Sequence, residues 1–478
     1  MQRGKFDMNP SEKKYSILES ALRNSFESSL SRSSNELTKV TEARLLAYEA
    51  FRKTGLPGRL NEKWRNSKFD QVSEQSYEVV SSKPTYTQKV SEIFQCSIHG
   101  FTTQVEALLN GWYYTSEKQT LRTMENGVVI GSIQTAQKEV PELFERHFGK
   151  IAKYNLHGYS HINTAFFNDG LFIYVPDQVH VEESIQLIKM VNDTQKLMIN
   201  SRNLVILGKN SHLSLMHCDD SVNHQSSMIN TVTEIFIGEN ASLDLYKLQN
   251  INNHTFLINS TSVVQQRNSR LKVNVITLNG GAIRNELNVD LQGEGAEADL
   301  NGIYLMDKKQ QVDNQVFVNH AVPNCNSSEL FKGVLDDESS AIFNGFVLVG
   351  RDAQKTNAFQ RNNNILMTST AKVDTMPFLE IYADDVKCSH GATIGQLDHD
   401  AMFYLMQRGI CKRDARLLLM YAFAAEVAEK IDIQPLRVSI EDMVKKRLRG
   451  ELSICEKCVL HCSTPDIPME FEIDMSKI

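Results

Sequence analysis

A short unit of β type recurs through the middle of this chain, and it limits the possible folds more than any other feature. The unit is a turn residue, then a small residue, then, after one further residue, two apolar residues separated by a single residue. Its copies begin at Asn210, Asn240, Asn268, Gly295, Glu338 and Thr370. The starts are separated by about 30, 28, 27, 43 and 32 residues, a quasi-period typical of solenoids. We therefore predict stacked coils whose apolar pairs share one core.

The surrounding region, residues 157–386, supports this prediction. It is rich in Asn, Ser, Thr, Val, Ile and Leu, and apolar residues alternate with polar ones as half-buried strands require. A β-sandwich would alternate in the same way, but its turns come at about 8 to 12 residues and need not fall at one repeated motif. The sequence favours a β-helix.

Helical patterns precede this region. Apolar residues recur every four positions from Leu18 to Leu30, and residues 37–53 repeat the pattern until Gly55-Leu-Pro-Gly58 ends it. Residues 85–154 mix strand-like and helix-like runs, and we expect them to link the first helices to the β region.

Helices are also predicted after the β region. Asp398 is the expected N-cap of one helix, a second covers 412–431, and the hydroxyl of Ser439 is the expected cap of a third. The zones together predict four domains: a helical and mixed N-terminal domain (1–156), a parallel β-helix core (157–386), a C-terminal helical domain (387–449) and a cysteine-containing tail (450–478).

The composition excludes several classes of function. With 51 basic and 58 acidic residues the net charge is -7, so no global positive field attracts nucleic acid or anionic lipid. The first residues lack the apolar core of a secretory signal, and no apolar run reaches the length of a membrane span. The eight cysteines are too scattered for the framework of a small secreted domain. We expect a cytoplasmic protein that binds neither nucleic acid nor membrane.

Enzyme motifs are missing from the sequence. It contains no G-x-x-x-x-G-K-[ST] phosphate loop, no H-E-x-x-H and no G-x-S-x-G. We therefore expect no nucleotide to be bound by this chain, and a stand-alone enzyme is the less favoured class. A polysaccharide-acting β-helix enzyme would also need clustered carboxylates or an aromatic-lined groove and a secretion signal, and the sequence indicates neither.

Cys388 and His390 are the residues best suited to chemistry. Their side chains share one face if the segment is extended, where the last predicted strand passes into the helical zone. A thiolate beside an imidazole suits a soft metal or an iron–sulfur species, but two ligands are too few for a closed site. Two other interpretations stay open: a buried cysteine beside a hydrogen-bonded histidine, and a Cys–His nucleophile pair oriented by Asp384 or Asp385.

A second cysteine group lies in the tail. Cys455, Cys458 and Cys462, with His461 adjacent, have a spacing that fits zinc or a cluster. No other C-x-x-C exists in the chain to complete such a site, so a reduced, exposed tail is the favoured interpretation. We leave the tail unassigned.

The region around His390 resembles a known family. Residues 386–398, Val-Lys-Cys-Ser-His-Gly-Ala-Thr-Ile-Gly-Gln-Leu-Asp, with Met402-Phe-Tyr-Leu405 and Arg408-Gly-Ile410, closely resemble the SufD family of iron–sulfur cluster assembly proteins. Further agreement comes from Gly55-Leu-Pro57, Phe343-Asn-Gly345, Asn362-Asn-Asn364, Glu380-Ile-Tyr-Ala-Asp-Asp385 and Tyr421-Ala-Phe-Ala-Ala425. The similarity is strongest over 326–431.

The resemblance implies a fold and a role. It implies a right-handed parallel β-helix between helical domains, acting as a non-catalytic scaffold subunit of a SufB–SufC–SufD complex. SufB would pair with this chain and share a transient iron–sulfur cluster with it, while one SufC ATPase would dock on the C-terminal helices, 398–429, and hydrolyse ATP. SufB has a Glu-His-Glu-Ala type of sequence where this chain has Cys-Ser-His-Gly-Ala-Thr, which favours SufD.

The resemblance also suggests site residues. His390 corresponds to the SufD histidine that faces the SufB site, and Cys388 to its neighbouring cysteine, whose role the resemblance leaves open. SufB-like chains carry a cysteine shortly upstream, but residues 361–387 contain none here, so we expect that ligand from the partner. The alternative is a self-contained homodimer that binds or carries a preformed cluster through Cys388 and His390.

Overall fold

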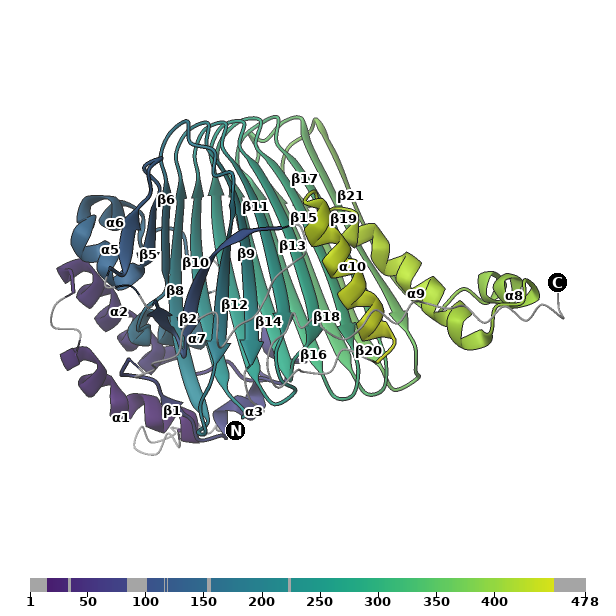
Figure 1. Cartoon of the computed structure of the whole chain (residues 1–478), viewed down its shortest axis with the longest axis horizontal. Coiled ribbons are helices and arrows are strands. Elements are labelled where there is room, and N and C mark those ends of the chain that lie inside the picture. Colours follow the sequence, from purple (N-terminus) through teal and green to yellow (C-terminus); the bar gives the residue numbers. More distant parts are fainter. Residues whose placement is uncertain are drawn as a thin grey trace, which may run out of the picture.

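The protein is a parallel β-solenoid of about seven turns with helices toward both ends of the chain (Figure 1). The structure, a computed structural model, describes residues 15–32, 36–83, 101–115, 117, 119–152, 156–221 and 225–450. The prediction of a mainly β solenoid flanked by helices is confirmed. No helix in these described ranges is long and apolar enough to span a membrane.

Successive strands of the solenoid fall alternately into two sheets, so each coil gives one strand to each sheet. The even-numbered sheet contains β6 (Leu171–Val175), β8 (Leu197–Leu207), β10 (Met228–Ile237), β12 (Phe256–Gln265), β14 (Ala282–Leu291), β16 (Gln311–His320), β18 (Ser340–Val349) and β20 (Lys372–Ile381). The odd-numbered sheet contains β7 (Ser184–Val191), β9 (His212–Ser221), β11 (Ser242–Asn250), β13 (Arg270–Asn279), β15 (Glu297–Met306), β17 (Asn326–Leu335), β19 (Thr356–Leu366) and β21 (Val386–Gly395).

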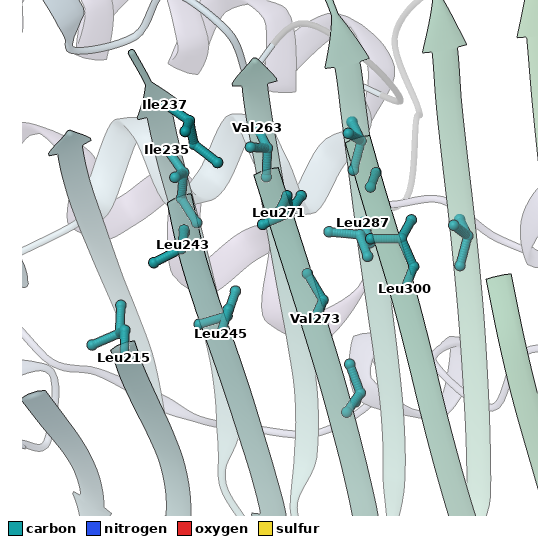
Figure 2. Packing of buried hydrophobic residues seen from close by; sticks show 14 of the residues in the cluster. Leu215, Ile235, Ile237, Leu243, Leu245, Val263, Leu271, Val273, Leu287 and Leu300 are labelled. Atoms are coloured by element: carbon teal, nitrogen blue, oxygen red, sulfur yellow. The ribbon is translucent and has the colours of Figure 1, made fainter. Parts of the chain in front are cut away.

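Parallel pairing in register stacks equivalent residues of successive coils into columns. One interior column of the odd-numbered sheet contains Ile185, Leu215, Leu245, Val273 and Leu300, each the register partner of the next. The last four are labelled in Figure 2. These side chains lie in the largest buried apolar cluster, which fills the space between the two sheets. The alternation read from the sequence therefore corresponds to an inward and an outward face on each strand.

The repeated turn residue has a conformational reason. Asn210, Asn240 and Asn268 adopt positive φ angles of 51°, 56° and 53°, which asparagine tolerates better than most residues. Their side chains also stack, because Nδ2 of Asn240 donates to Oδ1 of Asn210 at 2.9 Å and Nδ2 of Asn268 donates to Oδ1 of Asn240 at 3.2 Å. Gly295 follows in the same position, with φ 75°.

The irregular interval of the repeat has a structural explanation. The first four copies precede strands of the odd-numbered sheet, whereas Glu338 and Thr370 precede β18 and β20 of the other sheet. The copies of the odd-numbered sheet continue instead at Asn324 and Lys355, with φ angles of 64° and 59°. The interval of about 43 residues thus joins two different turns, and the coils themselves stay regular.

The solenoid begins earlier and ends later than predicted. β2 (Thr103–Leu109) pairs with β7, so the expectation that residues 85–154 only link two regions is wrong for its described part. The two sheets end there in short antiparallel strands, β3 (Trp112–Tyr114), β4 (Leu121–Thr123) and β5 (Val129–Ser132). The short strand β1 (Glu78–Val79) pairs with β8. At the other end β21 extends to Gly395. The division into four domains stays a prediction.

The N-terminal helices pack on the outer face of the even-numbered sheet. Their apolar residues form one cluster with Met198, Phe256 and Ile258 of that sheet. Helix α5 and helix α6 lie at the first end of the solenoid (Figure 1). These elements are α1 (Ile17–Arg32), α2 (Thr38–Thr54), η1 (Glu62–Trp64), α3 (Asp70–Ser73), α5 (Ile133–Glu139), α6 (Pro141–His147) and α7 (Gly158–Phe166).

The C-terminal helices are α8 (His399–Gln407), α9 (Lys412–Ala428) and α10 (Gln434–Leu448), and α9 and α10 cover the outer face of the odd-numbered sheet. The predicted cap Asp398 is confirmed, since its carboxylate accepts hydrogen bonds from the backbone N–H groups of residues 400 and 401. The cap at Ser439 is wrong, because α10 begins earlier, at Gln434, with Pro435 in its first turn. Proline suits that position because it has no N–H to satisfy there.

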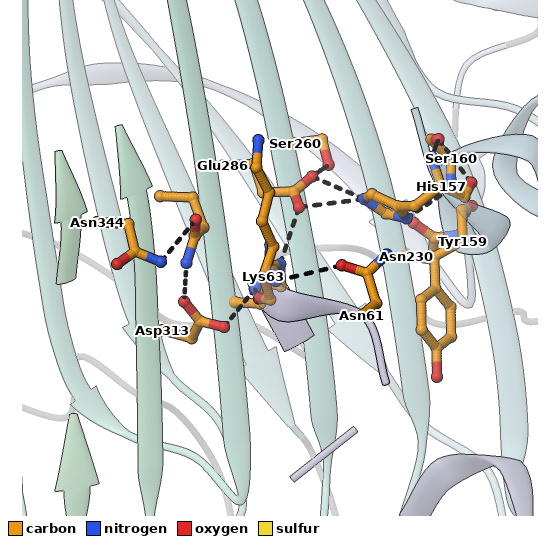
Figure 3. A network of polar contacts seen from close by, with 12 residues as sticks. Asn61, Lys63, His157, Tyr159, Ser160, Asn230, Ser260, Glu286, Asp313 and Asn344 are labelled. Atoms are coloured by element: carbon orange, nitrogen blue, oxygen red, sulfur yellow. Dashed lines mark hydrogen bonds and ion pairs between the residues drawn. The ribbon is translucent and has the colours of Figure 1, made fainter. Parts of the chain in front are cut away.

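A buried ion network fastens the N-terminal segment to the solenoid (Figure 3). The Arg284 guanidinium, on β14, contacts Glu286 at 2.8 Å, pairs with Asp313, and donates to the backbone oxygen of Lys63 at 3.1 Å. His157 Nε2 lies 3.1 Å from Glu286. Burial opposes ionisation of Glu286, but His157 and Arg284 more than offset it and hold the pKa of that carboxyl well below its usual range.

We predict that Arg284→Ala strongly destabilises the protein. The substitution removes the cation that pairs with buried Asp313 and leaves Glu286 paired with His157, which costs about 3–5 kcal/mol of unfolding free energy. Arg270→Ala is the matched control, because Arg270 also pairs with a glutamate of the next coil but is 74% exposed. It should cost less than about 1 kcal/mol. Urea unfolding measures both, and equal losses would contradict the assignment.

Candidate functional site

The solenoid ends at two strands with an unpaired side. β20 and β21 are the terminal strands of their sheets and pair only with β18 and β19, respectively, among the described strands. Each edge presents a row of backbone N–H and C=O groups suited to pairing with another strand. Large apolar side chains are exposed on and beside β20, namely Met376, Phe378 and Tyr382. This end, defined here as the open end, carries both residues singled out in the sequence.

Cys388 lies in a column of small and apolar interior residues. Its register partner is Ala358, which is fully buried, and the thiol packs against the interior apolar cluster. Burial raises the pKa of the Cys388 thiol, and so favours its neutral form. These surroundings are those of a small core residue rather than of an activated thiolate.

His390 lies two residues further along β21, on the same face as Cys388. Unlike Cys388 it is exposed, because no further coil covers the end of the solenoid. Cys388 and His390 thus lie on one face of β21, as predicted, but only the imidazole of His390 is exposed to solvent. The described residues contain no group of three or more His, Cys, Asp or Glu side chains arranged to hold a metal ion.

Two residues behind His390 were not anticipated. Gln360 is the register partner of His390, and Glu329 is the register partner of Gln360. Both are buried, with Gln360 3% and Glu329 2% exposed, and Gln360 Nε2 donates to Glu329 Oε2 at 2.7 Å. Burial raises the pKa of Glu329 to about 7, although the hydrogen bond from Gln360 acts in the opposite direction. Their position behind His390 follows from the pairing register of the last coils, which the sequence motif does not give.

The C-terminal helices differ in how they attach. In α9, Glu426 pairs with Lys332 and Arg361 of the solenoid. In α10, Arg447 is buried, with Nε donating to the backbone oxygen of Leu278 at 2.6 Å. Helix α8 has no buried residue, and it projects beyond the last coil (Figure 1).

The predicted tail cysteines Cys455, Cys458 and Cys462 lie outside the described residues. Their assignment is unchanged by the structure. The open end therefore carries the candidate site, with the imidazole of His390 at its surface.

Comparison with known proteins agrees with this architecture. Residues 190–423 match the model of the SUF system FeS cluster assembly SufBD core domain, and residues 11–187 match that of the SufBD protein N-terminal region. The two matches together cover most of the chain. The chain belongs to the SufBD family.

Individual SufBD relatives support a SufD-type chain. The chain is 40% identical to the iron–sulfur cluster assembly protein SufD of Escherichia coli over 173 residues, which is 36% of this chain and 41% of that protein. It is 26% identical to the SufD of Bacillus subtilis over 333 residues, 68% of this chain and 75% of that one. A SufBD family protein of Synechocystis is 28% identical over 350 residues, covering 71% and 76% of the two chains. The predicted resemblance to SufD is confirmed.

In this SufD-type chain, Glu329 predicts a particular pH dependence of stability. Its folded pKa of about 7 lies above the value of about 4.3 in an unfolded chain, so the folded state alone keeps the proton between these values. Stability from this group is full below pH 4 and is lost as the pH rises to 7. Glu329→Gln does not ionise and should be the more stable protein at pH 8, by up to about 3 kcal/mol, with the difference shrinking toward pH 4.5.

The control for this prediction is Glu338→Gln, since Glu338 is 66% exposed. Urea unfolding at pH 5 and pH 8 compares each variant with the natural chain. A stability difference for Glu329→Gln that is the same at both pH values would show that the carboxyl is not buried as described.

Proposed function

We propose that this protein is a non-catalytic scaffold subunit for iron–sulfur cluster assembly, which pairs through its open end with a SufB-type chain. The observation that carries the proposal is the coincidence of two unpaired edge strands with an exposed histidine, His390, on one of them. The membership of the SufBD family supplies the chemistry, since its core model is one of iron–sulfur cluster assembly.

Physical considerations favour a protein partner at this end. Unpaired edges of sheets bind other strands unless they are blunted, and β20 and β21 are ten residues long and pair in unbroken register with the preceding coils. Met376 and Phe378 expose apolar surface to water in a free chain, and a pair would bury that surface. A similar solenoid end on the partner supplies matching edges.

His390 would provide one ligand for the growing cluster. A neutral imidazole binds iron, and the remaining ligands would come from the SufB-type chain, because the described residues offer no complete set beside it. Cys388 remains a candidate ligand, although its burial against Ala358 favours a packing role. The cluster is the product of this assembly and is shared transiently across the interface.

Helix α8 would begin the surface that docks a SufC-type ATPase. Phe403 and Tyr404 are 64% and 58% exposed, and Met406 is 39% exposed, so the helix presents three large apolar side chains to a partner. Helix α9 connects this surface to the solenoid through Glu426. A change at the ATPase would thus reach the open end through elements that are in contact, with ATP hydrolysis in the partner.

Tagged expression with SufB-type and SufC-type chains tests the assembly. A complex of one SufB, one SufD-type and two SufC chains, by native mass, is the expected result. A homodimer of this chain that binds iron without either partner would instead support the alternative of a self-contained cluster carrier.

We predict that His390→Ala abolishes cluster formation without unfolding the protein. The side chain is exposed and has no hydrogen bond among the described residues, so its loss costs little stability. The measurement is iron and sulfide per complex purified without oxygen, with the unfolding free energy determined in parallel. Normal iron and sulfide content would remove His390 from the site.

Two substitutions on the same strand serve as controls. Ser389→Ala alters the neighbouring side chain on the opposite face of β21 and should leave the cluster content unchanged. Cys388→Ala places at this position the residue found beneath it in the previous coil. Cluster content near that of the natural chain would confirm the packing role of Cys388, and its loss would identify a second ligand.

We also predict that Phe403→Ala combined with Tyr404→Ala releases the ATPase. The double substitution removes most of the exposed apolar surface of α8, and recovery of the SufC-type chain should fall at least tenfold while the SufB-type chain remains bound. Leu46→Ala, on α2, is the control because Leu46 is 73% exposed on a helix remote in sequence. Unchanged SufC recovery would place the docking surface elsewhere.

A further inference from the structure

One interior column of the solenoid changes character over its last three coils. Its earlier members, from Ile185 to Leu300, are apolar, and Leu215, Leu245, Val273 and Leu300 are labelled in Figure 2. The following members are Glu329, Gln360 and His390. A carboxyl and an amide in a core cost free energy unless all their polar atoms are hydrogen-bonded. Their presence only behind the open end indicates a role at that end.

The Gln360 side chain has one satisfied end and one unsatisfied end. Its Nε2 donates to Glu329 Oε2 at 2.7 Å, whereas its Oε1 is buried and has no hydrogen-bond partner in the described part of the chain. When Glu329 is ionised, as at alkaline pH, its carboxylate only accepts hydrogen bonds and so fixes which end of the amide faces it. The carbonyl oxygen of Gln360 is left as a free acceptor.

The opposite sheet confines this amide. Gly345, on β18, has no side chain, and a Cβ added there would lie 2.0 Å from Gln360 Nε2. The amide of Gln360 therefore occupies the space that a larger residue at 345 would fill. Close packing on this side limits the rotation of the amide.

His390 is the next member of the column and offers the matching donor. Adjacent parallel strands lie about 4.8 Å apart, so side chains of register partners on one face are neighbours. His390 makes no hydrogen bond among the described residues, so both ring nitrogens are available. A neutral imidazole has one N–H donor, and the group that accepts it decides which nitrogen keeps its lone pair.

We propose that Gln360 is a positioning residue for His390: the exposed imidazole would turn to donate its Nδ1–H to the free Oε1 of Gln360, and Glu329 holds Gln360 in that orientation. The Nε2 lone pair then faces out of the solenoid toward iron. This inference rests on the proposed role of His390 as a ligand. Such outer partners of ligating histidines fix the tautomer and ring orientation, and their loss typically costs about 10- to 100-fold in metal affinity or activity.

The first test observes the tautomer without any cluster. The full chain, labelled with ring ¹³C and ¹⁵N histidine, is studied by NMR at pH 8, and the His390 signal is identified by its absence from His390→Ala. We expect the Nδ1–H tautomer to predominate in the natural chain, and Gln360→Leu to shift the population toward Nε2–H. The same population in both proteins would overturn the proposal.

The second test separates the hydrogen-bond chain from simple packing. Glu329→Gln keeps an acceptor for Gln360 Nε2 and should preserve the tautomer, whereas Glu329→Leu removes the acceptor and should alter it. Gly345→Ala displaces the Gln360 amide without touching β21 and should act like Gln360→Leu. Identical spectra for Glu329→Gln and Glu329→Leu would exclude Glu329 from this role.

The third test measures assembly. Complexes of the Gln360→Leu chain, co-expressed with SufB-type and SufC-type partners, should contain about tenfold less iron and sulfide than natural complexes, at an equal yield of assembled subunits. Full cluster content in Gln360→Leu but none in His390→Ala would overturn this inference alone. Full cluster content in both would overturn the proposed function as well.

Discussion

The structure depends on the register of parallel strands in successive coils. Hydrogen bonds between coils fix each residue above its equivalent, from β7 and β9 at one end to β19 and β21 at the other. A slip of one residue would turn every interior side chain outward, so the apolar columns and the pairing stabilise the same arrangement. The same register decides which residues stand behind Cys388 and which behind His390. The candidate site is in this sense the last layer of the core.

The sequence predicted the solenoid because its turn residues and small buried residues repeat together. The small position after each turn is fully or almost fully buried, as in Ala241, Ser269 and Ala296. The coil at Asn324 lacks the motif for two reasons: Cys325 stands at the small position, where it is equally buried, and Ser327 and Glu329 replace the two apolar residues. The requirement for a small buried side chain beside the turn is therefore kept in this coil, whereas the apolar pair is not.

The candidate site was predicted in part for the same reason. Cys388 and His390 were visible from their chemistry and spacing, but Gln360 and Glu329 carry no motif of their own. They come close to His390 only because strands of successive coils pair. Such pairing joins residues far apart in sequence: Gln360 donates to Glu329 across 31 positions, and Asn363 donates to Thr393 across 30. Helix starts show a similar limit, since Ser439 and Pro435 both carry start signals and only the packing of α10 on the sheet selects between them.

The two ends of the solenoid are not equivalent. At the first end the sheets finish in β3 and β4, antiparallel strands of three residues, whereas the described strands at the other end finish in full-length parallel edges. A solenoid with two long edges would add copies head to tail without closing and so grow into a fibre. With one long-edged end, two chains that meet end to end leave no further full-length edge. The short first strands would thus limit the proposed end-to-end association to pairs and prevent growth into a fibre.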